Sequence, residues 1–249
     1  MLTYLCNMKI AEQIRTFIDR TESGELFGYE QLGIAKKDYA TAAKALERLQ
    51  KQGVIKKASK GVFYKPEQTV LGELGPNYDK YLERRLFKNG KRIGYVTGSA
   101  LYNSLNLTTQ MTFSPSIAFT GRGSKIEKGW LRARPAKAYV TVTDENYQLL
   151  GILDALKDIK SIPDTRPEYA IKILMSRMKK YEDETIRQLI TYSLSYPPRV
   201  RALLGAMVET LFEKKFDFEI LRQSLNPLTK YKLSISKALL PNASTWNLI

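Results

Sequence analysis

Residues 38–66 constrain the fold more than any other part of the chain. Apolar side chains recur at helical spacing over residues 38–52, which predicts an amphipathic helix. Its core-facing stripe consists of Ala42, Ala45, Leu46 and Leu49. Gly53 follows where a left-handed residue commonly ends a helix. Two short extended runs, 54–58 and 62–65, then follow. The segment therefore predicts a helix leading directly into a β-hairpin.

Two further helical segments precede this unit. Residues 8–20 carry a single apolar stripe, and residues 29–32 fit a short helical turn. Three helices followed by a hairpin are typical of a winged helix-turn-helix domain. Glycine and proline punctuate the polar connector that follows, so we place the domain boundary after residue 68.

The charge of the chain points to a polyanionic partner. The formal net charge is +15, and residues 33–66 alone contain nine lysines and arginines against two carboxylates. A concentration of positive charge on one small domain is the electrostatic signature of nucleic-acid binding. If these side chains neutralise several phosphates, the affinity for DNA falls steeply with added salt.

Helical spacing places one group of polar side chains opposite the apolar stripe. Thr41, Lys44, Arg48 and Lys51 share a face. We expect Lys37, Tyr39, Thr41 and Lys44 to reach base edges or the groove, and Arg48, Lys56, Lys57 and Lys60 to hold phosphates. The complete predicted DNA-binding set is Lys36, Lys37, Tyr39, Thr41, Lys44, Arg48, Lys51, Lys56, Lys57 and Lys60. The alternative is a solvated face on a winged helix that docks another protein.

Residues 69–249 predict a larger α+β domain, with a small sheet and a helical C-terminal part. We expect a helix near 78–87 and a strand from residue 94 that enters a helix at Gly98–Ser99. Further strands are predicted at 116–120, 129–133 and 138–142. Further helices are predicted at 145–159, 167–180, 182–195, 200–213 and 216–225. The pattern does not fix the topology of this domain.

A second basic patch lies in this domain. It comprises Arg122, Lys125, Lys128, Arg132 and Arg134, with Lys137 beyond them. The patch could extend a DNA track or dock an acidic partner. Residues 121–125 resemble a phosphate-cradling loop but lack the Walker spacing, which favours a lysine-bearing turn.

The composition excludes several kinds of chemistry. The chain has no histidine, which removes catalytic schemes that need an imidazole, and Cys6 alone cannot form an internal disulfide. We expect a cytoplasmic protein with no signal peptide, no membrane span, no catalytic residue, no metal and no cofactor. The carboxylates of residues 182–184 leave a metal-dependent, nucleotide-handling enzyme as an alternative, although acidic residues commonly open helices.

Several segments resemble the AbiEi-type antitoxin family. The run from Ala42 through Gly53 to Pro66 looks like the amino-terminal winged helix of that family. Residues 98–110 are similar to the start of its second domain, and 196–205 and 225–229 resemble its C-terminal segments. The resemblance therefore covers most of the chain, and its most specific part is the Ala-Leu-Tyr-Asn and Thr-Thr-Gln run within 98–110.

The resemblance implies an antitoxin of a type IV toxin–antitoxin system, which takes part in abortive infection as a phage defence. Its first domain would bind double-stranded operator DNA and repress its own operon. Its second domain would counter a nucleotidyltransferase toxin without necessarily forming a stable complex. Gly98–Ser99 and Gly123–Ser124 lack the metal-binding aspartates expected of the toxin, which places the chain on the antitoxin side. A protein-interaction scaffold built on a winged helix remains the alternative.

Overall fold

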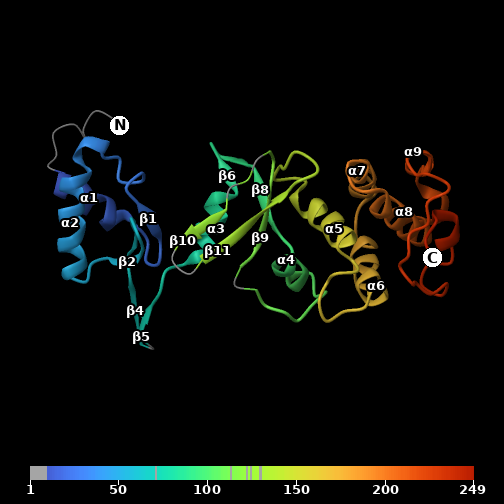
Figure 1. Cartoon of the computed structure of the whole chain (residues 1–249), viewed down its shortest axis with the longest axis horizontal. Coiled ribbons are helices and arrows are strands. Elements are labelled where there is room, and N and C mark those ends of the chain that lie inside the picture. The colour runs from blue at the N-terminus through green and yellow to red at the C-terminus, as the bar shows by residue number, and fades with distance from the viewer. Residues whose placement is uncertain (1–9, 71, 113, 122, 124, 129–130) are drawn as a thin grey trace. The chain divides into compact units, whose positions relative to one another are not determined.

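The computed structural model describes residues 10–70, 72–112, 114–121, 123, 125–128 and 131–249. The chain forms two compact units (Figure 1). The first contains the residues up to Arg85 together with Glu127–Leu131, and the second contains Leu86–Ile126 and Arg132–Ile249. Helices and strands both contribute, so the predicted α+β class is confirmed. No helix in the described ranges is long and apolar enough to cross a membrane.

The first unit packs helices against a three-stranded antiparallel sheet of strand order β1-β3-β2. Its first elements are α1 (Ile10–Arg20), β1 (Leu26–Gly28), the 3-10 helix η2 (Lys36–Asp38), α2 (Tyr39–Lys51), β2 (Lys56–Ser59) and β3 (Val62–Tyr64). The predicted inward face of α2 is confirmed, because all four of its apolar side chains are buried. They share one core with side chains of α1 and the sheet, among them Ile14, Ile18, Phe27 and Phe63.

The end of α2 follows the predicted geometry. Gly53 has a φ of +73°, a conformation that glycine adopts without steric cost. The N–H of Val54 donates to the carbonyl of Leu49 over 3.0 Å, and the N–H of Gly53 donates to the carbonyl of Gln50 over 3.0 Å. These bonds satisfy carbonyls at the end of the helix and turn the chain directly into the hairpin.

Two features of this unit differ from the prediction. β1 was not anticipated, yet it pairs with β3 in the register Phe27↔Phe63 and completes the sheet. Residues 29–33 form hydrogen-bonded turns that are too short to count as a helix; the N–H groups of Gln31 and Leu32 donate to the carbonyls of Gly28 and Tyr29, three residues back. The side chain of Gln31 accepts a bond from the N–H of Gly28 over 2.8 Å, which holds the turn against the strand.

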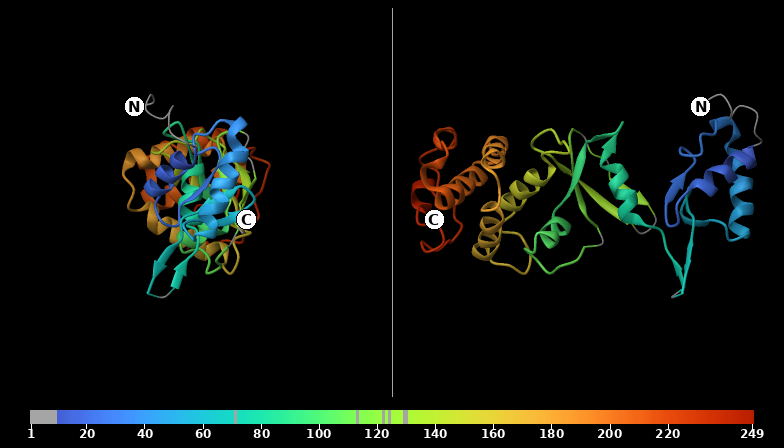
Figure 2. Two further views of the ribbon diagram at one scale, coloured as in Figure 1. Left: turned by 90° about the vertical axis from the view of Figure 1, so that its left-hand side faces the viewer. Right: turned by 180° about the vertical axis from the view of Figure 1, so that it is seen from behind.

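The first unit also extends beyond the expected boundary at residue 68. A second hairpin, β4 (Glu67–Thr69) and β5 (Gly72–Leu74), projects from the unit (Figure 2) and is followed by α3 (Tyr78–Arg85). The backbone N–H of Asn77 donates to the carbonyl of Gly24 over 2.7 Å. Two ion pairs tie α3 to the segment after α1: Lys80–Glu22 and Arg84–Glu25. These contacts make α3 part of the first unit.

A small mixed sheet follows α3 in the chain. The hairpin β6 (Phe87–Lys88) and β7 (Lys91–Arg92) leads into β8 (Gly94–Thr97) and α4 (Ser99–Ser104), followed by β9 (Ser116–Phe119), β10 (Ile126–Lys128) and β11 (Leu131–Lys137). The strand order is β10-β11-β9-β8; β8 and β9 are antiparallel, whereas β9 and β11 are parallel. The predicted strands at 94 and 116 and the helix after Gly98 are thereby confirmed.

The prediction of a strand at 138–142 is wrong. Pairing with β9 ends at the first residue of this segment, where the N–H of Ala138 donates to the carbonyl of Phe119 over 3.2 Å, and later groups bond to side chains. The N–H of Val142 donates to the hydroxyl of Thr120 over 2.8 Å, and the amide of Asn146 donates to the carbonyl of Thr141 over 2.9 Å. Of the strand expected at 129–133, residues 129–130 lie outside the described part of the chain, and β11 covers the remainder.

The C-terminal part is helical, as predicted. It contains α5 (Tyr147–Lys157), α6 (Pro167–Met178), α7 (Asp183–Ser193), α8 (Pro198–Phe212), η3 (Glu213–Lys215), α9 (Glu219–Gln223) and η4 (Ala243–Trp246). Most side chains of α5 and of the first half of α8 are buried, so these two helices form the centre of the unit. Trp246 packs so closely on α8 that a Cβ at Gly205 would lie 2.3 Å from its ring.

A buried carboxyl joins the sheet to the helices. Asp154 of α5 is 2% exposed. Its Oδ2 accepts hydrogen bonds from the hydroxyl of Tyr95 (2.9 Å) and from Thr97 Oγ1 (2.7 Å), both on β8. Its Oδ1 accepts a bond from the hydroxyl of Tyr196, which precedes α8 (3.3 Å). Burial raises the pKa of Asp154 because it disfavours the charged form, while the hydroxyls of Thr97 and Tyr95 oppose that shift.

The raised pKa of Asp154 predicts a pH-dependent stability. Above the ordinary pKa of 3.8 the unfolded carboxyl loses its proton while the folded one still holds it. The free energy of unfolding therefore falls as the pH rises from about 4 to the folded-state pKa, and this contribution is constant above it. Chemical denaturation of the wild-type protein and of Asp154→Asn gives the free energy of unfolding of each across this pH range. The difference between the two values isolates the contribution of the carboxyl. A difference that does not change with pH would contradict it.

Candidate nucleic-acid interface

The outward face of α2 carries the predicted polar side chains. Thr41, Lys44 and Arg48 are exposed, one turn after another, on the side opposite the buried stripe. Neither Lys44 nor Arg48 forms an ion pair or hydrogen bond with any described residue, so both charges are available to a ligand. Lys51 lies on the same face, but its ammonium contacts the carboxylate of Glu47 at 3.0 Å. The two cations of this face that have no internal partner, Lys44 and Arg48, therefore lie within the first three turns of the helix.

The start of α2 adds two more cations and an aromatic ring. Lys36 and Lys37 are exposed on η2, directly before the helix, and Tyr39 is half-buried at its first position. Asp38 occupies the N-cap position of α2, but its side chain makes no capping hydrogen bond. The N–H groups of a helix start attract anions, and the partial positive charge of the helix dipole adds to the attraction. This end of α2 therefore suits a phosphate.

The β2–β3 hairpin carries the remaining predicted cations. Lys57 and Lys60 are exposed and have no ion pair with a described residue, and Gly61 turns the chain with a φ of +71°. Lys56 differs, because its ammonium lies 2.7 Å from the carboxylate of Glu73 on β5. The hydrogen bond to Glu73 raises the pKa of Lys56 and engages its charge within the unit. We therefore rank Lys57 and Lys60 above Lys56 as phosphate contacts.

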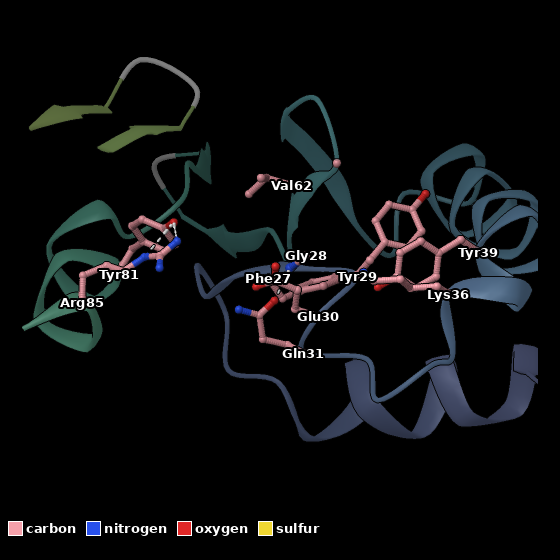
Figure 3. A pocket seen from close by; sticks show the side chains of 11 residues that line it. Phe27, Gly28, Tyr29, Glu30, Gln31, Lys36, Tyr39, Val62, Tyr81 and Arg85 are labelled. Atoms are coloured by element: carbon pink, nitrogen blue, oxygen red, sulfur yellow. Dashed lines mark hydrogen bonds between the residues drawn. The ribbon is translucent and has the colours of Figure 1, made fainter. Parts of the chain in front are cut away.

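Tyr29 links the helix start to the hairpin. Its ring lies 4.9 Å from the ring of Tyr39 and 6.2 Å from that of Phe63, measured between centroids, and Gly61 of the hairpin turn lies beside it. Figure 3 shows Tyr29 and Tyr39 together at the edge of a hollow of about 330 Å³, which Lys36 also lines. Aromatic pairs of this kind contribute about 0.5–1.5 kcal/mol beyond the area they bury. The ring thus fixes the hairpin turn relative to the first turn of α2.

The sequence pattern does not indicate the roles of Tyr29 and Lys65. No periodicity reveals that the ring of Tyr29 meets residues on two other elements. The ammonium of Lys65 donates to the carbonyls of Ile18 (3.4 Å) and Thr21 (3.3 Å) at the end of α1. This cation therefore holds the unit together and is not a phosphate contact.

The second basic patch is only partly described. Arg122 lies outside the described residues, as does the side chain of Lys128. Lys125, Arg132 and Arg134 are exposed. Arg132 and Arg134 lie two residues apart on β11 and so share a face of that strand, with buried Ala133 between them on the other. Of the second basic patch, the structure therefore places Arg132 and Arg134 side by side on one face of β11.

The alternative catalytic features have structural roles where they are described. Glu182 is the N-cap residue of α7, and Asp183 in its first turn pairs with Lys215 at 2.7 Å. Gly98, with a φ of +70°, occupies the N-cap position of α4, as expected of a helix start. Of residues 121–125, which resemble a phosphate-cradling loop, 122 and 124 lie outside the described part of the chain. Among the described residues, no three His, Cys, Asp or Glu side chains are grouped to hold a metal ion.

Comparison with known proteins gives a family but no activity. No curated protein matches the chain. The family DUF6088, described as a family of unknown function, matches residues 9–186. The match includes the first unit and the second unit as far as the beginning of α7. Because it covers well over half of the sequence, the chain belongs to the DUF6088 family.

Proposed function

We propose that this protein is a DNA-binding transcriptional regulator whose first unit acts as a winged helix-turn-helix. In this proposal α2 enters the major groove of an operator duplex, and the β2–β3 hairpin contacts the neighbouring phosphates. The observation that carries the proposal is the exposed face of Thr41, Lys44 and Arg48, with cations free of internal partners. The protein acts in the cytoplasm, where such DNA is found.

The geometry of the unit suits this role. Thr41 and Lys44 lie in the first turns of α2, the part of a docked helix that reaches base edges, and Arg48 lies one turn further along. Lys60 lies next to Gly61, which contacts the same Tyr29 ring as the start of α2. A rigid spacing between helix and hairpin matches the fixed spacing between a groove and its flanking phosphates. A protein-docking surface would need no such spacing of cations.

We further propose that the second unit counters a nucleotidyltransferase toxin. This part rests on the resemblance of residues 98–110, 196–205 and 225–229 to AbiEi-type antitoxins. We expect a nucleotidyltransferase gene beside the gene for this chain, and we expect co-expression of this chain to restore growth of cells that express that enzyme. Growth that stays arrested would refute the antitoxin role and leave the DNA-binding proposal standing.

Removing one cation from the helix and one from the hairpin tests the DNA interface. We expect Lys44→Ala with Lys60→Ala to weaken binding to the duplex upstream of the chain's own gene. The slope of log affinity against log salt should fall by about 2, since each lost phosphate contact contributes about 0.9. Fluorescence anisotropy at several salt concentrations measures both quantities. The control is Lys160→Ala with Lys232→Ala, two exposed lysines of the second unit; equal losses in the two pairs would contradict the assignment.

Replacing Tyr29 tests the link between helix and hairpin. Tyr29→Ala removes two ring contacts, and we expect the free energy of unfolding of the first unit to fall by about 2 kcal/mol, less than for a fully buried aromatic. Duplex affinity should fall several-fold because the hairpin turn loses its fixed position. Tyr29→Phe keeps the ring and should retain both properties. Unchanged duplex affinity of a folded Tyr29→Ala protein would show that the link does not serve binding.

A further inference from the structure

The second unit carries a groove that the proposed functions do not use. It has a volume of about 730 Å³ and runs along the outer side of α6. Its lining includes Tyr169, Lys172, Arg177, Lys180, Tyr181 and Asn106, the last of which follows α4. All of these residues belong to the second unit. The groove is therefore complete without the DNA-binding surface of the first unit.

The fold fixes which side of α6 forms the groove. Ala170, Ile171, Leu174 and Met178 are buried on the inner side of the helix. The lining residues follow at helical spacing on the outer side, from Tyr169 to Lys180 just past its end. These eleven steps correspond to about 16 Å along the axis at about 1.5 Å per residue. A surface of this length accommodates an extended ligand and not only a single small anion.

The charge of the groove lining is positive. The groove is lined by three cations and by no carboxylate. Lys172, Arg177 and Lys180 form no ion pair with a described residue. Two nearby acids are engaged elsewhere, since the carboxylate of Glu168 accepts the N–H of Ser236 and Asp183 pairs with Lys215. A third, Glu182, is exposed but does not line the groove. The groove therefore attracts an anionic chain.

The aromatic side chains narrow the kind of anionic chain. Tyr169 is 60% exposed, and half-buried Tyr181 lines the same groove. Tyrosine rings beside lysines and arginines are the arrangement on which single-stranded nucleic acids stack their bases while cations hold the phosphates. In a duplex the bases are stacked inside the helix, and only their edges are accessible to such rings. An acidic peptide would use the cations but has no base to stack on the tyrosines.

We propose that the α6 groove binds single-stranded nucleic acid. Lys172, Arg177 and Lys180 hold successive phosphates, and Tyr169 stacks on a base. The ribose or deoxyribose of the strand faces the polar edge of the groove at Asn106. This site is separate from the proposed duplex-binding face of α2, so an experiment can refute either proposal without refuting the other.

The test uses the full chain with Lys44→Ala and Arg48→Ala, so that the first unit contributes little to binding. The probes are fluorescein-labelled RNA and DNA single strands of about 12 nucleotides, within the range that one single-strand-binding module covers. Fluorescence anisotropy at several salt concentrations gives the dissociation constant. The variants are Lys172→Ala with Lys180→Ala, Tyr169→Ala and Tyr169→Phe. The matched control is Lys179→Ala, which removes an exposed lysine beside the groove but not in its lining.

We expect the double lysine variant to weaken binding about tenfold and to lower the salt slope by about 1.4, since each phosphate contact to a single strand contributes about 0.7. Tyr169→Ala should weaken binding about tenfold, the effect of losing one base stack, whereas Tyr169→Phe and Lys179→Ala should bind like the parent. Lys172→Gln with Lys180→Gln, which keeps most of each alkyl stem, should reproduce the double alanine result.

Three results would overturn the proposal. They are no measurable binding of either strand to the parent, equal loss from Lys179→Ala and from the groove variants, and binding that the groove variants leave unchanged. Groove variants that reduce capture of an acidic protein while sparing the strands would reassign the surface. Duplex binding by the chain with an intact α2 face should be unchanged by the groove variants, which separates this proposal from the one for the first unit.

Discussion

The cationic face of α2 reaches solvent because the opposite face of the same helix is locked into the core of the first unit. Leu46 and Ala42 pack with Ile14 and Ile18 of α1 in one cluster, and the helical repeat then leaves Lys44 exposed on the other side. Burial of each leucine or isoleucine side chain of this cluster stabilises the fold by about 1.5–3 kcal/mol. Rotating α2 to hide its lysines would expose this apolar stripe and bury unpaired charge, so the core itself orients the binding face.

In the second unit, a buried hydrogen-bond network fixes the sheet against the helices. The carboxyl of Asp154 is the common acceptor for hydroxyls of Tyr95 and Thr97 on β8 and of Tyr196 before α8. A buried hydroxyl that loses its partner costs about 1–3 kcal/mol, so the network favours one arrangement of the sheet against the helices. The same helical part of the chain positions α6, whose buried inner side leaves its cations and tyrosines outward.

Sequence periodicity predicted the long helices and the faces of α2, because burial on one side of a helix leaves a repeat of 3.6 residues. It could not predict β1, since three residues are too few to show alternation. It placed a strand at 138–142, where β-branched residues instead bond to the side chains of Thr120 and Asn146. In the site, it identified Lys44 correctly as exposed but could not foresee the pairing of Lys56 with Glu73, because that contact depends on an unpredicted hairpin.

Amide hydrogen exchange of the full chain, with and without the duplex from upstream of its own gene, tests whether the cationic face of α2 binds DNA. We expect slower exchange on DNA binding in peptides that cover η2, the first three turns of α2 and the β2–β3 turn, with excess salt abolishing the change. Protection confined to other segments, such as β11 or α6, would contradict it. So would a chain that binds no duplex and shows no change in exchange at any salt concentration.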